Sequence, residues 1–113
     1  MQPRDERILE HIVDYCEDVQ DALSLIECSY EHFIGDKQSQ YSIAFSIMQI
    51  GELVGKLSEE LRLSTRQEID WPAVKGMRNI IVHDYGEVRL SVVWNVATDD
   101  IPVLKAFCEK HLK

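Results

Sequence analysis

Apolar residues recur every three or four positions along most of this 113-residue chain. The first run consists of Ile8, Ile12, Cys16, Val19, Leu23 and Ile26. An α-helix turns once in about 3.6 residues, so this spacing places the run on one face of a helix. The sequence contains no alternation with a period of two, the pattern that would indicate a β-strand. The chain is therefore predicted to be all-α.

Turn-forming residues divide this pattern into four long helices. We expect helices over residues 4–28, 37–61, 70–86 and 90–113, joined by a short helical connector at 29–35 and a turn at 64–68. Pro3 and Pro72 suit the first turn of a helix, where a backbone N–H is not needed. Pro102 should kink or break the fourth helix near residues 98–101. Short connections predict an antiparallel up-and-down four-helix bundle with short extra helical turns.

The second expected helix is apolar on two sides. One stripe consists of Ile43, Ile47, Ile50, Val54, Leu57 and Leu61, and a second of Tyr41, Ala44, Phe45 and Met48. A helix of this kind is expected to be buried on both sides. Gly51 and Gly55 share a face although each costs up to ~1 kcal/mol in a helix. They indicate either a close helix–helix contact, which we favour, or a ligand role.

Length and charge limit the classes of protein that this chain can form. The 113 residues fit one domain, residues 1–113, and the net charge of −8 excludes a broad basic surface for coating nucleic acid. DNA is therefore not an expected partner, but a local phosphate site is compatible with this charge. No apolar run reaches the ~20 residues of a membrane span, and the charged N-terminus lacks a signal-peptide core. These features predict a cytoplasmic protein.

The cysteines and isolated histidines indicate neither a metal nor a cofactor. Cys16, Cys28 and Cys108 are odd in number and widely spaced, so neither a disulfide framework nor a zinc site is predicted. We expect three free thiols that are buried or half-buried, as is usual in a cytoplasmic protein. His11, His32 and His111 have no His or Cys neighbour at a ligand spacing.

The strongest candidate site is the segment 78–85, Arg-Asn-Ile-Ile-Val-His-Asp-Tyr. On a helix, Arg78 and Tyr85 lie two turns apart on nearly one face, while Asn79 and His83 share a neighbouring stripe. Val74, Met77 and Ile81 fall on the opposite, apolar side. Arginine is a planar, permanently charged partner of phosphate, and histidine moves protons near neutral pH.

This segment therefore suggests phosphoryl-transfer or phosphodiester chemistry, with positive charge added by Lys75 and Arg89. From spacing alone, a simpler interpretation stays open. Arg78 and His83 could be surface residues that complement the dipole at the C-terminal end of a helix, with Gly86 following it.

Arg78, His83 and Tyr85 also form the pattern R-x-x-x-x-H-x-Y, which resembles the signature of the HepT-like toxins in the HEPN ribonuclease superfamily. Further blocks of that family are similar and occur in the same order: residues 48–54, 71–79, 93–94 and 100–104. The resemblance is clear over residues 41–105, and no motif position departs from it.

The resemblance implies a metal-independent endoribonuclease that is the toxin of a toxin–antitoxin pair. It implies a homodimer whose cleft receives the motif from both subunits. His83 would move a proton, Arg78 would stabilise charge on the scissile phosphate, and Asn79 would orient either group. Lys75 would add to substrate binding. The expected products are a 2′,3′-cyclic phosphate and a 5′-hydroxyl.

The resemblance also implies a partner, a small MntA-like nucleotidyltransferase that acts as antitoxin by transferring AMP to Tyr85. Two alternatives stay open. The chain could be a non-catalytic binding partner and substrate of that enzyme, which its acidic charge fits slightly better, or a helical scaffold without chemistry.

Overall fold

The computed structural model describes residues 1–82 and 89–113. In chain order the elements are α1 (Pro3–Leu25), α2 (Tyr30–Ile34), α3 (Lys37–Val54), α4 (Glu59–Ser64), α5 (Trp71–Val82), α6 (Leu90–Asn95), the π-helix η1 (Val96–Asp100) and α7 (Ile101–Leu112). Every regular element within the described residues is therefore helical, which confirms the predicted fold class.

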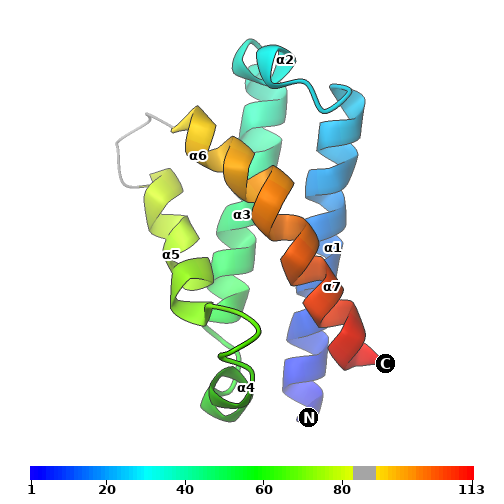
Figure 1. Cartoon of the computed structure of the whole chain (residues 1–113), viewed down its shortest axis with the longest axis vertical. Helices are drawn as coiled ribbons and strands as arrows, with labels where there is room; N and C mark the ends of the chain where they lie inside the picture. Colours follow the sequence, from blue (N-terminus) through cyan, green and yellow to red (C-terminus); the bar gives the residue numbers. More distant parts are fainter. Residues whose placement is uncertain (83–88) are drawn as a thin grey trace.

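The helices form an up-and-down bundle with extents of 42 × 28 × 21 Å. Helices α1 and α3 pack side by side, α5 packs against α3, and α7 packs against α1 (Figure 1). The short helices α2 and α4 lie at opposite ends of the bundle, and both chain termini lie near the α4 end (Figure 1). Helix α2 is the short helical connector predicted at residues 29–35, whereas the first half of α4 lies within the helix predicted at residues 37–61.

The core follows the predicted apolar stripes. Seven stripe residues are fully buried: Ile12, Cys16, Val19, Ile43, Ile47, Ile50 and Val54. Phe33, from the connector before α3, is also fully buried and packs against Trp94, with ring centroids 5.3 Å apart. Burying a large apolar side chain stabilises a fold by about 1.5–3 kcal/mol, so these stripes hold α1 and α3 together.

Helix α1 ends at Leu25, three residues before the predicted end. The amide of Cys28 donates to the carbonyl of Leu23, and the amide of Glu27 donates to that of Ser24. This pair of bonds is a Schellman motif, which usually has glycine at the position that Glu27 occupies here with φ 55°. Because this position lacks glycine, the sequence contains no signal for the end of the helix.

The predicted helix over residues 37–61 is divided in two. Helix α3 ends at Val54 with Gly55 as its C-cap, and α4 begins after Ser58, whose hydroxyl accepts a hydrogen bond from the amide of Leu61. Leu57 and Leu61 remain buried, so the apolar stripe continues across the break. The N-cap preference of serine explains the new start.

The prediction that both apolar sides of this helix are buried is wrong for the single chain. Tyr41 is 60% exposed and Phe45 is 55% exposed, although Ala44 of the same stripe is buried. The expectation of buried or half-buried thiols is also wrong for Cys28, which is exposed, while Cys16 and Cys108 are buried. The turn that ends α1 directs Cys28 away from the core.

The predicted irregularity before Pro102 is confirmed as a π-helical stretch, η1. The amide of Ile101 donates to the carbonyl of Val96, five residues earlier. Pro102 follows directly in the first turn of α7 and has no amide hydrogen to donate. The wider turn thus lies where the regular hydrogen-bond ladder would lose a donor.

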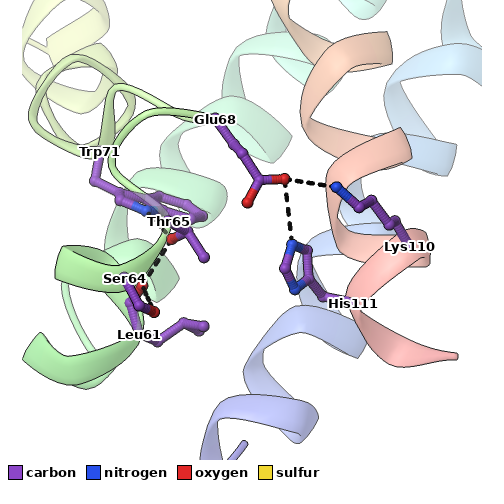
Figure 2. Close-up of polar contacts among 7 residues, drawn as sticks. All are labelled: Leu61, Ser64, Thr65, Glu68, Trp71, Lys110 and His111. Carbon is purple, nitrogen blue, oxygen red and sulfur yellow. Dashed lines mark hydrogen bonds and ion pairs between the residues drawn. The ribbon is translucent and has the colours of Figure 1, made fainter.

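Side-chain contacts hold the turn between α4 and α5 against α4, α5 and α7 (Figure 2). The indole Nε1 of Trp71 donates to Thr65 Oγ1 at 2.8 Å, and Thr65 Oγ1 donates to the carbonyl of Leu61 at 2.7 Å. Glu68 pairs with Lys110 Nζ at 2.9 Å and with His111 Nε2 at 3.4 Å. These contacts fix the start of α5 relative to α4 and α7.

A buried carboxylate joins the first turn of α1 to the start of α4. Asp5 is 2% exposed and accepts hydrogen bonds from the amide of Ser58 at 2.9 Å and from its hydroxyl at 2.6 Å. A buried carboxylate is stabilising only when donors of this kind satisfy it.

None of the helices in the described residues is long and apolar enough to cross a membrane.

Candidate functional site

A small cleft lies between α3 and α5, with a cavity volume of about 340 Å³. Its lining includes three glycines and four polar side chains: Gly51, Gly55, Gly76, Glu52, Lys75, Arg78 and Asn79. We refer to it as the α3–α5 cleft. The sequence analysis predicts substrate contact for Lys75, Arg78 and Asn79, which are the polar residues of α5. All three line this one surface hollow.

The glycines bring the two helices close together. A Cβ atom placed on Gly51 would lie 3.2 Å from Arg78 Cβ and 3.4 Å from the carbonyl oxygen of Lys75. A Cβ atom on Gly55 would lie 3.6 Å from Lys75 Cε. The predicted close helix–helix contact is therefore confirmed, and it lies directly beneath the two cations of α5.

Helix α5 has the predicted two-sided character. Val74 and Met77 are buried, whereas Lys75, Arg78 and Asn79 are exposed. His83, Tyr85 and Gly86 lie outside the described residues, as does the predicted end of this helix at residues 85–86. Their roles, and the stripe that Asn79 would share with His83, remain predictions.

Arg78 is paired with a residue that the sequence analysis did not select. Its Nη1 lies 2.7 Å from Oε1 of Glu52, the residue that follows Gly51 on α3. The two side chains are 54% and 42% exposed, so the ion pair lies at the mouth of the cleft. The available signal is a charged residue at the end of a helix face whose preceding positions, Tyr41, Phe45 and Met48, are apolar.

Lys75 and Arg78 are three residues apart on α5 and therefore lie on one helix face. A guanidinium and an ammonium group beside a hollow lined by glycine suit a phosphate group, since small residues let a phosphodiester approach closely. In a chain with a net charge of −8, this local positive charge is what a phosphate site would need.

The other candidate groups have structural partners. His111 pairs with Glu68, and its ring lies 4.3 Å from that of Phe107. His32 Nε2 lies 3.9 Å from an oxygen of Asp36, which caps α3. The described part of the chain contains no group of three His, Cys, Asp or Glu residues that could hold a metal ion.

The fold and the cleft define a class, the all-α bundle proteins that carry adjacent cations between two antiparallel helices. Comparison with known proteins makes this specific. The chain belongs to the HepT-like ribonuclease family, which matches residues 6–111.

Individual relatives agree with this assignment. A protein of Thermococcus cleftensis named "Probable ribonuclease HepT" is 32% identical over 105 residues, which cover 88% of this chain and 94% of that protein. A protein of Methanocaldococcus jannaschii named "Putative RNase" is 32% identical, covering 93% of this chain and 84% of its own length. No solved structure matches the chain.

Proposed function

We propose that this chain is a metal-independent endoribonuclease and the toxin of a toxin–antitoxin pair. The observation that carries this proposal is the position of Arg78, exposed beside Lys75 at a cleft lined by glycine. Membership of the HepT-like ribonuclease family supplies RNA as the substrate class. The free cysteines and the absence of an apolar span in the sequence support a cytoplasmic location.

The proposed reaction transfers a phosphodiester within the RNA chain. The ribose 2′-oxygen attacks phosphorus and the bond to the 5′-oxygen breaks, which leaves a 2′,3′-cyclic phosphate and a 5′-hydroxyl. His83 would take the proton from the 2′-hydroxyl or give one to the departing oxygen. Arg78 would stabilise the charge that develops on the phosphate, while Asn79 and Lys75 hold the substrate.

RNA cleavage by the purified protein tests this reaction. Wild-type protein should cleave single-stranded RNA in the presence of a chelator, and Arg78→Ala and His83→Ala should each lower the rate by about 100-fold or more. Circular dichroism should show that both variants keep the fold. Cleavage by His83→Ala at the wild-type rate would exclude the proton-transfer role.

We further propose a homodimer, formed through the exposed stripe of α3. Tyr41, Phe45, Met48 and Glu52 follow one another at spacings of four and three, so they share one helix face. The aromatic end of this stripe is exposed, and the other end is the residue that pairs with Arg78. A second copy packed on this stripe would bring two α3–α5 clefts near each other.

Light scattering tests the dimer. Wild-type protein should have twice the chain mass at micromolar concentration, whereas Phe45→Ser should be monomeric and inactive. Leu63→Ser is a matched control, since Leu63 of α4 is also 55% exposed but lies outside the stripe. A wild-type monomer that cleaves RNA would exclude a composite site.

The partner proposed for this toxin is an MntA-like nucleotidyltransferase that transfers AMP from ATP to Tyr85. The phenol oxygen would attack the α-phosphorus of ATP and displace pyrophosphate. The added phosphate would be negatively charged and could compete with RNA for Arg78. Support for this proposal comes from the R-x-x-x-x-H-x-Y pattern of the sequence.

Mass spectrometry after co-expression tests the modification. An AMP unit should be found on Tyr85, and Tyr85→Phe should resist neutralisation by the partner. AMP on another residue alone would disprove the assignment.

A second candidate function is that of a non-catalytic binding partner and substrate of the nucleotidyltransferase. The net charge of −8 favours it, because most of the surface would repel RNA. The two functions differ in one result. Purified protein that accepts AMP but does not cleave RNA at any salt concentration would establish the second.

A further inference from the structure

Two consecutive residues of α3 contact the two ends of the Arg78 side chain. Gly51 lies against its Cβ atom, where a methyl group would be only 3.2 Å away. Glu52 lies at the other end, with Oε1 at 2.7 Å from Nη1. One helix thus fixes both the origin and the head of a long, flexible side chain.

Stability does not explain this ion pair. Both side chains are about half exposed, and exposed pairs of this kind are worth only about 0–1 kcal/mol because water and salt screen them. Arginine has about 2 kcal/mol of rotamer entropy, however, and a group that stabilises developing charge acts best when it is already oriented. Orientation is what a carboxylate at the head of the side chain can provide.

The geometry also leaves the guanidinium available to a substrate. A guanidinium group has five N–H donors on a planar fork. The pair with Glu52 uses Nη1, so the edge formed by Nε and Nη2 can make a bidentate contact with a phosphate. Glu52 and a phosphate can therefore contact Arg78 at the same time.

We infer that Glu52 is a positioning residue that holds the Arg78 guanidinium at the mouth of the α3–α5 cleft for contact with the scissile phosphate. This inference rests on the proposed ribonuclease function. Its rival is a competing role, in which Glu52 neutralises Arg78 and must be displaced by RNA. The two roles predict different effects of removing the charge. In the positioning role the cleavage rate falls, and in the competing role RNA binding becomes tighter.

Three variants separate these roles. Glu52→Gln keeps the shape and removes the charge, Glu52→Asp keeps the charge on a shorter side chain, and Glu10→Gln makes the same charge change at an exposed position of α1. The readouts are kcat and KM on single-stranded RNA, and Kd for a 2′-O-methyl RNA that cannot be cleaved. Thermal unfolding checks that each variant is folded.

For a positioning role, Glu52→Gln should lower kcat about 10-fold, less than the loss of a direct contact, with Kd changed by less than about twofold. Glu52→Asp should recover part of the rate, and Glu10→Gln should match wild type. On an Arg78→Ala background, Glu52→Gln should have no further effect, because two residues that act through one interaction are not additive.

Failure of the inference can be told apart from failure of the proposed function. If Arg78→Ala abolishes cleavage while Glu52→Gln matches wild type, binds RNA more tightly or cleaves faster, the positioning role is overturned and the ribonuclease stands. If Arg78→Ala cleaves as well as wild type, or wild type does not cleave, the proposed function is overturned and the inference with it. If Glu52→Gln fails to fold, Glu52→Asp replaces it in the test. Its shorter side chain should lower kcat in the wild-type protein and have no further effect on the Arg78→Ala background, and an equal loss on both backgrounds, or no loss on either, overturns the positioning role.

Discussion

The Cβ atom of Arg78 occupies the space into which a side chain on Gly51 would extend, at a distance of only 3.2 Å. This contact sets how closely α5 can approach α3. It also means that the residue most important for the proposed chemistry depends on the absence of a side chain on the facing helix. Gly76, the glycine that α5 contributes to the cleft lining, has no atom within 4 Å of the corresponding position.

We expect Gly51→Ala and Gly76→Ala to have opposite effects on stability. The added methyl on Gly51 should cost about 1–3 kcal/mol through overpacking, offset by about 1 kcal/mol of helix propensity. Gly76→Ala should gain up to about 1 kcal/mol because its methyl group enters open space. The free energies of unfolding of the two variants, measured in urea, should differ by about 1–3 kcal/mol. Equal values would show that the α3–α5 contact adapts without cost.

Asp5→Ala should lower the free energy of unfolding by about 3 kcal/mol. The substitution removes two hydrogen bonds from Ser58 to a buried carboxylate, and bonds of this type contribute about 1.5–3 kcal/mol each. Urea unfolding measures the loss, and Asp14→Asn at an exposed position of α1 should stay within about 0.5 kcal/mol of wild type. Similar values for the two variants would mean that the contact between α1 and α4 contributes little.

The contact of Glu68 with α7 should make a small, pH-dependent contribution to stability. The hydrogen bond from Lys110, with a further one from His111, lowers the pKa of Glu68 from its ordinary value of 4.5. A carboxyl whose pKa is lower in the folded state contributes stability above its unfolded value, and that stability is lost as the pH falls through the folded value. Wild type should therefore exceed Glu68→Gln in urea midpoint at pH 7, and the difference should be smaller at pH 3, below the ordinary pKa of the carboxyl.

Glu109→Gln, which alters an exposed acid of α7, is the control for this comparison. Its urea midpoint should follow that of wild type at both pH values. Added salt should reduce the effect of Glu68→Gln, because the pair is exposed. A difference between wild type and Glu68→Gln that is as large at pH 3 as at pH 7 would contradict an ionic origin.

A thiol reagent should modify one cysteine in the native protein and three after unfolding. Burial raises the pKa of Cys16 and of Cys108 to about 12, so both remain protonated and enclosed at neutral pH. The thiolate is the reactive form, which leaves the exposed Cys28 as the site of reaction. Counting labels by mass spectrometry with iodoacetamide tests this, and Cys28→Ser should remain unlabelled. Native labelling of Cys28→Ser would show that the core opens.

The long-range arrangement of the bundle could be predicted because its signals are strong. Apolar stripes at helical spacing located α1, α3 and the buried side of α5, and Pro102 located the irregular stretch before α7. The local ends of helices were harder to predict. Glu27 adopts a left-handed backbone conformation that glycine usually adopts, and a glutamate side chain gives no indication of that conformation.

The candidate site could be predicted in part. The polar face of α5 and the close approach of Gly51 follow from spacing and from the cost of glycine in a helix. The pairing of Glu52 with Arg78 could not be predicted, because it joins two helices and depends on how far apart and at what rotation they pack. The exposure of Tyr41 and Phe45 likewise depends on whether a second chain covers them.

The π-helical stretch Val96–Asp100 affects which changes in chain length the fold can accommodate during evolution. Its bonds span five residues where an α-helix spans four, so the stretch behaves as a one-residue insertion into a longer helix. Deleting one residue there, together with Pro102→Ala, would restore an unbroken ladder from α6 to α7 while both flanks keep their faces toward the core. Variation in the length of the chain can thus be absorbed at this point without repacking α1 and α3.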